Sequence, residues 1–189
     1  MSLQTTASQT VGPYLHIGLS WLVNADLTGP DITGHKVTIE GCITDGDGKP
    51  VNDALVEIWQ ANAAGRYAHP EDTRNLPLEA GFRGFGRVPT DEEGRFRFTT
   101  IKPGRVPGEG GVPQAPHINV TIFMRGMLTH LFSRIYFPDD PANATDPVLA
   151  RVAADRRGTL IAQHGAGNPS ALVWNVRLQG ERETVFFDV

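Results

Sequence analysis

The sequence predicts an all-β protein, an antiparallel β-sandwich with short helices and long irregular connections. Three observations lead to this prediction. The chain has six or more short runs in which apolar and polar residues alternate, its 21 glycines and 14 prolines gather largely between those runs, and helical periodicity is minor. Residues 1–189 are most simply one domain, which is long enough to bury a core without disulfides.

Three strands are predicted in the first half of the chain. Residues 36–43, 54–60 and 95–101 place apolar side chains at about every second position, as strands with one buried face do. In the last of these runs Phe96 and Phe98 share one face. We expect that face to point into the core.

The segments that join these strands are rich in turn-forming residues. Residues 44–50 and 91–94 predict hairpin turns. Asp45 and Asp47 could begin a calcium loop, but the rest of an EF-hand pattern is missing, so we favour the turn. Residues 61–87 form a connection of a length that is usually functional or disordered.

The two ends of the chain are expected to be less regular. Residues 1–35 predict an irregular N-terminal arm, in which the apolar segment 15–23 must pack on something. Near the other end, Asp146 and Pro147 resemble an N-cap and a first helical residue, so short helices are expected up to residue 163. Two further alternating runs close the chain.

Residues 114–141 are the stretch around which the sequence is organised. They predict two strands joined at Arg125 and Gly126. His117 and Asn119 are two residues apart on the first strand, so their side chains leave the same face. A second histidine at position 119 would be a strong metal signal, since two imidazoles at this spacing can bind one ion. The asparagine raises the question of whether a metal site has been lost.

Composition excludes several classes of partner. The net charge is −4 and no basic stripe is present, which argues against nucleic acid or an anionic membrane as the main partner. No signal-peptide pattern or membrane-spanning apolar run is found, so a soluble, cytoplasmic protein is expected. The single cysteine, Cys42, cannot form an internal disulfide and is expected to be buried and inert.

A set of motifs recurs in an order and spacing similar to the intradiol ring-cleaving dioxygenases, and the resemblance extends from Gln9 to Val189. Within that family the chain is most similar to the alpha chains of heteromeric members that cleave protocatechuate. The motifs are Thr10-Val-Gly-Pro-Tyr14, Val56-Glu-Ile-Trp-Gln-Ala-Asn62, Gly65-Arg-Tyr67, Phe85-Gly-Arg87, Thr99-Thr-Ile-Lys-Pro-Gly104, Ala115-Pro-His-Ile-Asn119, Arg134-Ile-Tyr-Phe137, Val176-Arg-Leu-Gln-Gly180 and Glu183-Thr-Val-Phe-Phe-Asp188.

The resemblance implies a ferric ion held by two tyrosines and two histidines in the catalytic members. Phenolate and imidazole suit a hard trivalent iron, whose charge lowers the pKa of a tyrosine enough to ionise it. The first tyrosine and histidine correspond to Tyr67 and His117, whereas the second of each corresponds to Val106 and Asn119. An arginine of the family corresponds to Gln114. Two ligands are missing, so no iron is expected in this chain.

Tyr67 and His117 could still hold a metal with help from elsewhere. The interpretation that we favour makes them structural, with His117 as a hydrogen-bonded histidine of the sheet and Tyr67 as a loop aromatic whose hydroxyl is paired.

The resemblance also implies a partner and a reaction. Fe(III) would be bound by a homologous beta chain, and several alpha/beta pairs would form a larger hetero-oligomer. The assembled enzyme would use O2 to open protocatechuate between its two hydroxylated carbons, giving 3-carboxy-cis,cis-muconate in aromatic catabolism. Two alternatives remain: a non-catalytic β-sandwich binding or scaffold protein, and an autonomous iron dioxygenase with a rebuilt site.

The N-terminal arm is expected to reach the partner chain. By the resemblance, Thr10, Gly12, Pro13 and Tyr14 would form a wall of the partner's substrate pocket. The alternative is a simple packing arm.

Arg134 shares a strand face with Phe132 and Tyr136, and the resemblance places it near the same pocket. A guanidinium there would suit the ring carboxylate of the substrate. The alternative is an internal salt bridge from Arg134 to Asp139 or Asp140.

Overall fold

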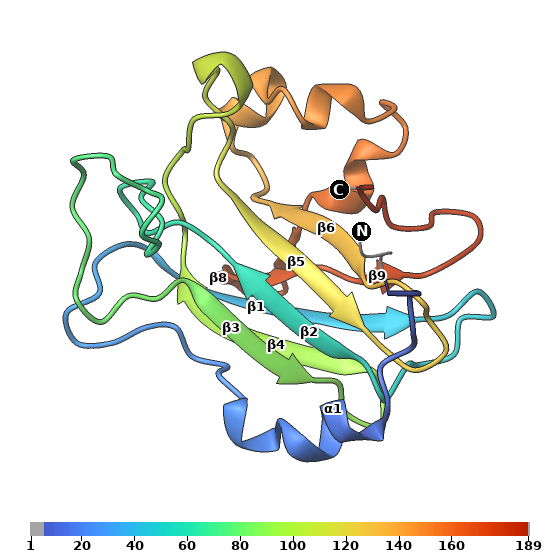
Figure 1. The fold of residues 1–189 in the computed structure, drawn as a ribbon. Coiled ribbons are helices and arrows are strands. Elements are labelled where there is room, and N and C mark those ends of the chain that lie inside the picture. Colours follow the sequence, from blue (N-terminus) through green and yellow to red (C-terminus); the bar gives the residue numbers. More distant parts are fainter. Residues whose placement is uncertain (1–5, 189) are drawn as a thin grey trace, which may run out of the picture.

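The computed structural model describes residues 6–188, which form two β-sheets packed face to face (Figure 1). One sheet has the strand order β4-β1-β8-β7, with β9 paired to β1, and the other has the order β3-β2-β5-β6. All pairs are antiparallel except β1 with β8 and β1 with β9. The predicted antiparallel β-sandwich is confirmed. None of the helices in residues 6–188 has the length and apolar character needed to cross a membrane.

The strands are β1 (Lys36–Thr44), β2 (Leu55–Trp59), β3 (Phe85–Pro89), β4 (Arg95–Ile101), β5 (His117–Phe123), β6 (Leu131–Tyr136), β7 (Gln163–Gly165), β8 (Asn168–Val173) and β9 (Val176–Arg177). One short α-helix, α1 (Pro13–Gly18), precedes them. The 3-10 helices are η1 (Ser20–Leu22), η2 (Glu109–Gly111), η3 (Pro141–Thr145), η4 (Leu149–Arg151) and η5 (Arg157–Leu160). The helices expected near the C-terminus are thus short 3-10 turns.

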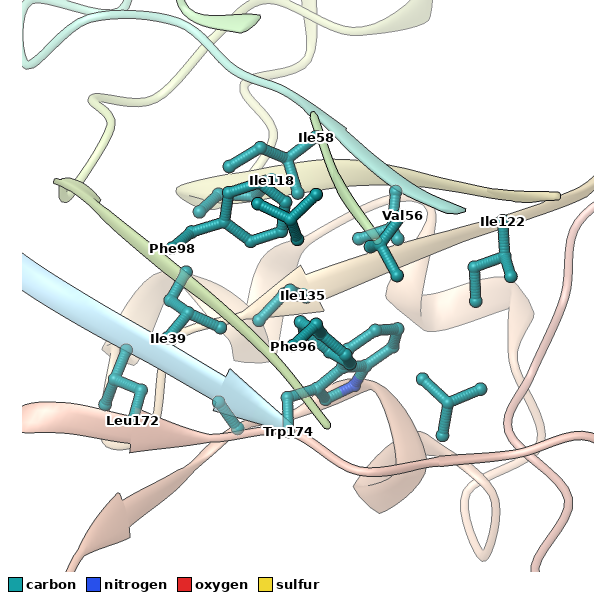
Figure 2. Packing of buried hydrophobic residues seen from close by; sticks show 14 of the residues in the cluster. Ile39, Val56, Ile58, Phe96, Phe98, Ile118, Ile122, Ile135, Leu172 and Trp174 are labelled. Carbon is teal, nitrogen blue, oxygen red and sulfur yellow. The ribbon is translucent and has the colours of Figure 1, made fainter. Parts of the chain in front are cut away.

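The core lies between the two sheets, because alternate residues of each strand point inward (Figure 2). Phe96 and Phe98 share the inner face of β4, as predicted, and Ile58 and Ile118 approach from the other sheet. All four are at most 4% exposed. Full burial of one such side chain contributes about 1.5–3 kcal/mol. The opposite face of the β3-β2-β5-β6 sheet is therefore free to carry polar groups.

The predicted turns form, but each lies between strands of different sheets. At the first, Thr44 bridges to Pro50, and Asp45 Oδ1 accepts hydrogen bonds from the backbone of Asp47 and Lys49. This turn uses the Asp45 carboxylate for its own backbone, as an Asx-turn does. Both turns are corners at which the chain crosses from one sheet to the other.

The arm is more ordered than expected. Pro13 begins α1, which the sequence did not indicate, and its fixed φ suits the first helical turn. Asn24 and Asp26 then bridge to β3 and β4, one in each sheet. The apolar segment 15–23 was expected to pack, yet Trp21 is 78% exposed and Ile17 is 69% exposed. Nothing in residues 6–188 covers these two side chains.

Cys42 is half-buried, so the expectation of a buried thiol was wrong. Its neighbours in β1, Gly41 and Ile43, face the core, and alternation turns Cys42 outward. The thiol contacts the backbone oxygen of Glu93 at 3.2 Å. Desolvation raises the pKa of the Cys42 thiol, which keeps it in its unreactive protonated form.

Candidate functional site

Two of the four positions that the resemblance implies as ligands, His117 and Asn119, lie on the outer face of the β3-β2-β5-β6 sheet. In the strand register, Asn119 lies between Trp59 of β2 and Arg134 of β6, and His117 lies opposite Tyr136. Directly opposite residues of antiparallel strands point to the same face. The sheet therefore places the aromatic rings of Trp59 and Tyr136, one amide, one imidazole and one guanidinium side by side.

His117 is a hydrogen-bonded histidine of the sheet, as we favoured. It is 3% exposed, and its Nδ1 donates to the backbone oxygen of Ala115 at 2.8 Å. Burial lowers the pKa of His117 to about 4, and the positive charge of Arg134 acts in the same direction. His117 is consequently neutral at physiological pH.

The neutral His117 makes stability depend on pH. Its folded pKa of about 4 lies below the ordinary 6.5, so between these values the unfolded chain binds a proton that the folded chain does not. The contribution of the neutral His117 to the free energy of unfolding is fully present above pH 6.5 and is lost as pH falls toward 4. Between pH 6.5 and pH 4 the free energy of unfolding should fall less in His117→Gln than in the unchanged chain, by about 2–3 kcal/mol. Urea denaturation at several pH values measures the free energy of unfolding of both proteins. The same dependence on pH in both proteins would contradict the prediction.

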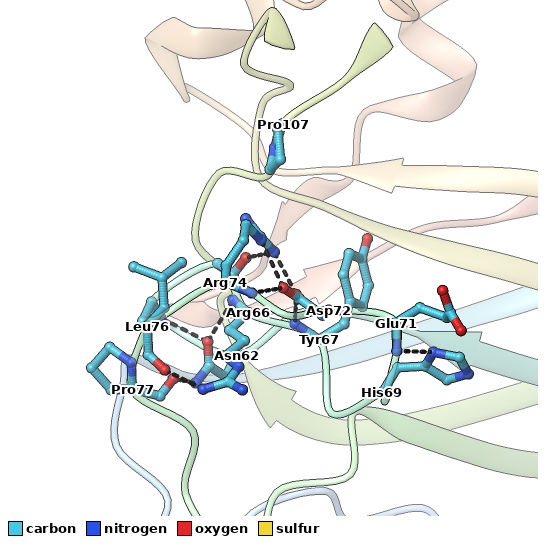
Figure 3. Close-up of polar contacts among 12 residues, drawn as sticks. Asn62, Arg66, Tyr67, His69, Glu71, Asp72, Arg74, Leu76, Pro77 and Pro107 are labelled. Carbon is cyan, nitrogen blue, oxygen red and sulfur yellow. Dashed lines mark hydrogen bonds and ion pairs between the residues drawn. The ribbon is translucent and has the colours of Figure 1, made fainter.

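Tyr67 is held in place by other residues of the connection between β2 and β3 (Figure 3). Its backbone N–H donates to Asp72 Oδ2 at 2.8 Å, and Arg74 Nε donates to Asp72 Oδ1 at 2.8 Å. The hydrogen bonds from Arg74 hold the pKa of Asp72 far below its usual range. The Tyr67 ring stacks on Trp59 at 5.8 Å between centroids. The clamp made by Asp72 and Arg74 was not recognised in the sequence, where only the two-residue spacing could have indicated it.

The base of this connection is fixed by Asn62, which is fully buried. Its Oδ1 accepts from the backbone of Ala64 and Arg66, and its Nδ2 donates to the Pro77 oxygen and to Glu79. One amide therefore joins the start of the connection to its middle (Figure 3).

Val106 and Tyr67 line one pocket with Trp59, His69 and Pro107, and its volume is about 580 Å³. The Val106 side chain has no atom that can coordinate a metal, and Val106 is 5% exposed. Burial raises the pKa of Tyr67, which disfavours the phenolate, although a hydrogen bond from Asn119 and the charge of Arg134 oppose this. Residues 6–188 contain no cluster of three or more His, Cys, Asp or Glu side chains suited to a metal. The residues present therefore do not fit a ferric ion.

Arg134 does not form the ion pair considered as its alternative role. Asp140 pairs with Lys102 at 2.7 Å, and Asp139 pairs with His164 at 3.1 Å. Arg134 is half-buried, and its Nη1 donates to Gln114 Oε1 at 2.6 Å. Its Nε and Nη2 donate no hydrogen bond to any residue between 6 and 188. One edge of the guanidinium is thus available to a ligand.

Tyr136 and Asp146 complete the polar network. The Tyr136 hydroxyl lies 3.5 Å from Arg134 Nη1 and donates to Asp146 Oδ1 at 3.0 Å. Burial raises the pKa of Tyr136 to about 12. Asp146 is 1% exposed and also accepts from the backbone of Ala115, Val148 and Leu149. The sequence predicted Asp146 as a helix cap and gave no sign that it reaches Ala115 and Tyr136.

The arm lies elsewhere on the chain. Thr10 Oγ1 accepts from the backbone N–H of Gly126 at 2.9 Å, and Gly12 and Pro13 line a pocket of about 240 Å³ with Arg125. The side chain of Tyr14 lies outside the described part of the structure. At about 3.3 Å per residue of β5, the Gly126 contact is roughly 20 Å from Asn119 and Arg134. One chain by itself therefore does not bring the arm and Arg134 together.

Comparisons with known proteins agree with this architecture. Residues 21–180 match the family model described as dioxygenase. The chain is 44% identical over 202 residues to the protocatechuate 3,4-dioxygenase alpha chain of Burkholderia cepacia, covering 100% of this chain and 99% of that protein. It is 44% identical over 133 residues to the beta chain from Burkholderia cepacia, covering 69% of this chain and 56% of that protein.

Among solved structures, catechol 1,2-dioxygenase from Acinetobacter sp. ADP1 matches with a TM-score of 0.60 and 25% identity, over 80% of this chain and 55% of that chain. The match to the alpha chain is end to end, and it confirms the resemblance inferred from the motifs. By the family model and by these relatives, the chain belongs to the intradiol ring-cleaving dioxygenases.

Proposed function

We propose that this chain is the subunit without iron in a heteromeric enzyme that opens protocatechuate with O2 to 3-carboxy-cis,cis-muconate. The observation that carries the proposal is the pair Val106 and Asn119, which offer neither a phenolate nor an imidazole where the resemblance implies the second tyrosine and the second histidine. The end-to-end similarity to an alpha chain supports it. A homologous beta chain would hold the Fe(III), and several alpha/beta pairs would assemble in the cytoplasm.

In this proposal Arg134 recognises the ring carboxylate of the substrate. Gln114 holds Nη1, and the edge with Nε and Nη2 is left for two parallel hydrogen bonds to a carboxylate. Such charge-assisted bonds are worth about 1.5–3 kcal/mol. The surrounding walls would exclude water, which strengthens every charge interaction within the pocket.

The residues Thr10, Gly12, Pro13 and Tyr14 would form a wall of the partner's pocket. Their separation from Arg134 means that they reach the same pocket only if the arm changes course on assembly or if two copies contribute. The hydrogen bond from Gly126 to Thr10 is solvent-exposed, so its loss costs little. This hydrogen bond therefore contributes little to holding Thr10 in its present position.

Metal content and activity test the proposal together. The full chain is purified alone and after co-expression with a homologue that has Tyr and His at the positions of Val106 and Asn119. Iron content and protocatechuate-dependent oxygen uptake are measured on both samples. We expect both only in the co-expressed sample. Iron and activity in the lone chain would contradict the proposal and favour an autonomous enzyme, whereas a lone chain with no affinity for the homologue would favour a scaffold.

The exposed Trp21 offers a test of assembly. Trp21 is 78% exposed, and tryptophan is enriched among the residues that dominate binding at protein–protein interfaces. We expect Trp21→Ser to weaken association with the beta chain about tenfold or more, and Leu128→Ser, at another exposed apolar residue, serves as the control. Analytical ultracentrifugation of the mixed chains measures it. Equal assembly by Trp21→Ser and the unchanged chain would exclude this role.

A further inference from the structure

Arg134 occupies the position beside the missing second histidine. Asn119 and Arg134 are direct cross-strand partners, and His117 and Tyr136 are the next pair on the same face. The Cβ atoms of such partners lie about 4.5–5.5 Å apart. The Arg134 side chain therefore rises from the sheet next to position 119, among the degenerate ligand positions.

The same side chain is tied to the loop of the missing tyrosine. Arg134 Nη1 donates to Gln114 Oε1 at 2.6 Å, and the backbone N–H of Gln114 donates to the Val106 oxygen at 2.8 Å. Gln114 Nε2 in turn donates to the Pro107 oxygen at 3.2 Å. Arg134, the cross-strand neighbour of Asn119, is thus linked through Gln114 to the loop of Val106, so it lies between the two positions that lack a ligand.

The positive charge of Arg134 has no carboxylate partner within residues 6–188. Its hydrogen-bond acceptors are the amide of Gln114 and the hydroxyl of Tyr136, and this hydroxyl separates it from Asp146. The site therefore retains a full positive charge in a half-buried position. Two cations in such an environment repel one another more strongly than they would in water.

We propose that the Arg134 guanidinium has replaced the metal as the cation of this site and excludes a metal ion even when the missing donors are restored. The substitutions at positions 106 and 119 are then only part of what keeps a metal out of this site. The arginine and its bridge through Gln114 keep the site metal-free, and they do so independently of any partner chain.

Restoring the donors with and without the arginine tests this proposal. One variant of the full chain carries Val106→Tyr and Asn119→His, and a second adds Arg134→Gln. Both are incubated with Fe(III) citrate and desalted, and then bound iron and tyrosinate-to-iron visible absorption are measured. We expect about one iron per chain with Arg134→Gln and less than about a tenth of that when Arg134 is present. Near-UV circular dichroism checks that both variants are folded.

A matched control separates Arg134 from a general loss of positive charge. Arg97 lies on β4 in the other sheet, with its side chain 67% exposed, and it pairs with Glu40. Adding Arg97→Gln to the variant with restored donors is expected to leave it poor in iron. The proposal is wrong if Arg134→Gln does not raise bound iron above the level of the variant that keeps Arg134.

A smaller change tests the same proposal without placing a tyrosine at the buried position 106. Asn119→His is compared with Asn119→His combined with Arg134→Gln, and Ni²⁺ is the probe in isothermal titration calorimetry. His117 and the new histidine then offer two imidazoles on one strand face. We expect binding at least about tenfold tighter without Arg134. Equal affinities would overturn the proposal. No partner is present, so a negative result here leaves the proposed heteromeric function intact.

Discussion

Replacing Arg134 with alanine is expected to lower kcat/KM of the assembled enzyme for protocatechuate about 10- to 100-fold. The variant loses charge-assisted hydrogen bonds worth about 1.5–3 kcal/mol, and each 1.4 kcal/mol corresponds to a factor of ten. Iron content should not change, because we place the metal in the partner chain. Oxygen uptake over a range of substrate concentrations, together with iron analysis, measures both quantities.

Two variants sharpen the Arg134 experiment. Arg134→Lys keeps the charge but loses the planar pair of donors, so its activity should fall between that of alanine and arginine. Arg97→Ala removes an exposed arginine on the other sheet and should leave kcat/KM unchanged. Unaltered kinetics of Arg134→Ala would rule out contact with the substrate. Lost iron would show instead that the substitution disturbs the partner.

Asp146→Ala is expected to reduce the free energy of unfolding by about 3–5 kcal/mol. The carboxylate is 1% exposed and accepts hydrogen bonds from three backbone N–H groups and the Tyr136 hydroxyl. Each buried donor that loses its only acceptor costs about 1–3 kcal/mol. For a chain of this size the melting temperature should fall by roughly 10 °C.

Asp47→Ala is the matched control for Asp146→Ala, because the Asp47 side chain is 79% exposed. Its melting temperature should lie within about 1–2 °C of the unchanged chain, as is usual for surface substitutions. Differential scanning calorimetry gives both values. If Asp146→Ala melts together with Asp47→Ala, then the hydrogen bonds of Asp146 contribute far less than their burial indicates.

Much of the fold could be predicted from local patterns. The alternation around Phe96 and Phe98 identified β4 and its inner face, and the clusters of Gly, Asp and Pro located the turns. Both signals concern residues close together in sequence. Which strands share a sheet depends on contacts between distant segments, so the sequence did not reveal that both turns cross between sheets.

The candidate site likewise combines features that local sequence patterns predict with features that they do not. The two-residue spacing correctly placed His117 and Asn119 on one face. The network from Gln114 through Arg134 and Tyr136 to Asp146 spans four separate segments, and no local pattern indicates it. The apolar segment 15–23 predicts burial, but an apolar run does not tell whether this chain or another covers it, and Trp21 is exposed in the single chain.

Positions 106 and 119, to which the resemblance assigns the second tyrosine and the second histidine, lie outside both hydrophobic clusters, with Val106 in a loop and Asn119 on the outer sheet face. The packing of the two sheets therefore does not depend on the side chains at positions 106 and 119. Substitutions at positions 106 and 119 therefore carry little penalty to the packing of the core. The 44% identity over 133 residues with a beta chain fits this separation, because changes at positions 106 and 119 leave the packing between the sheets unaltered.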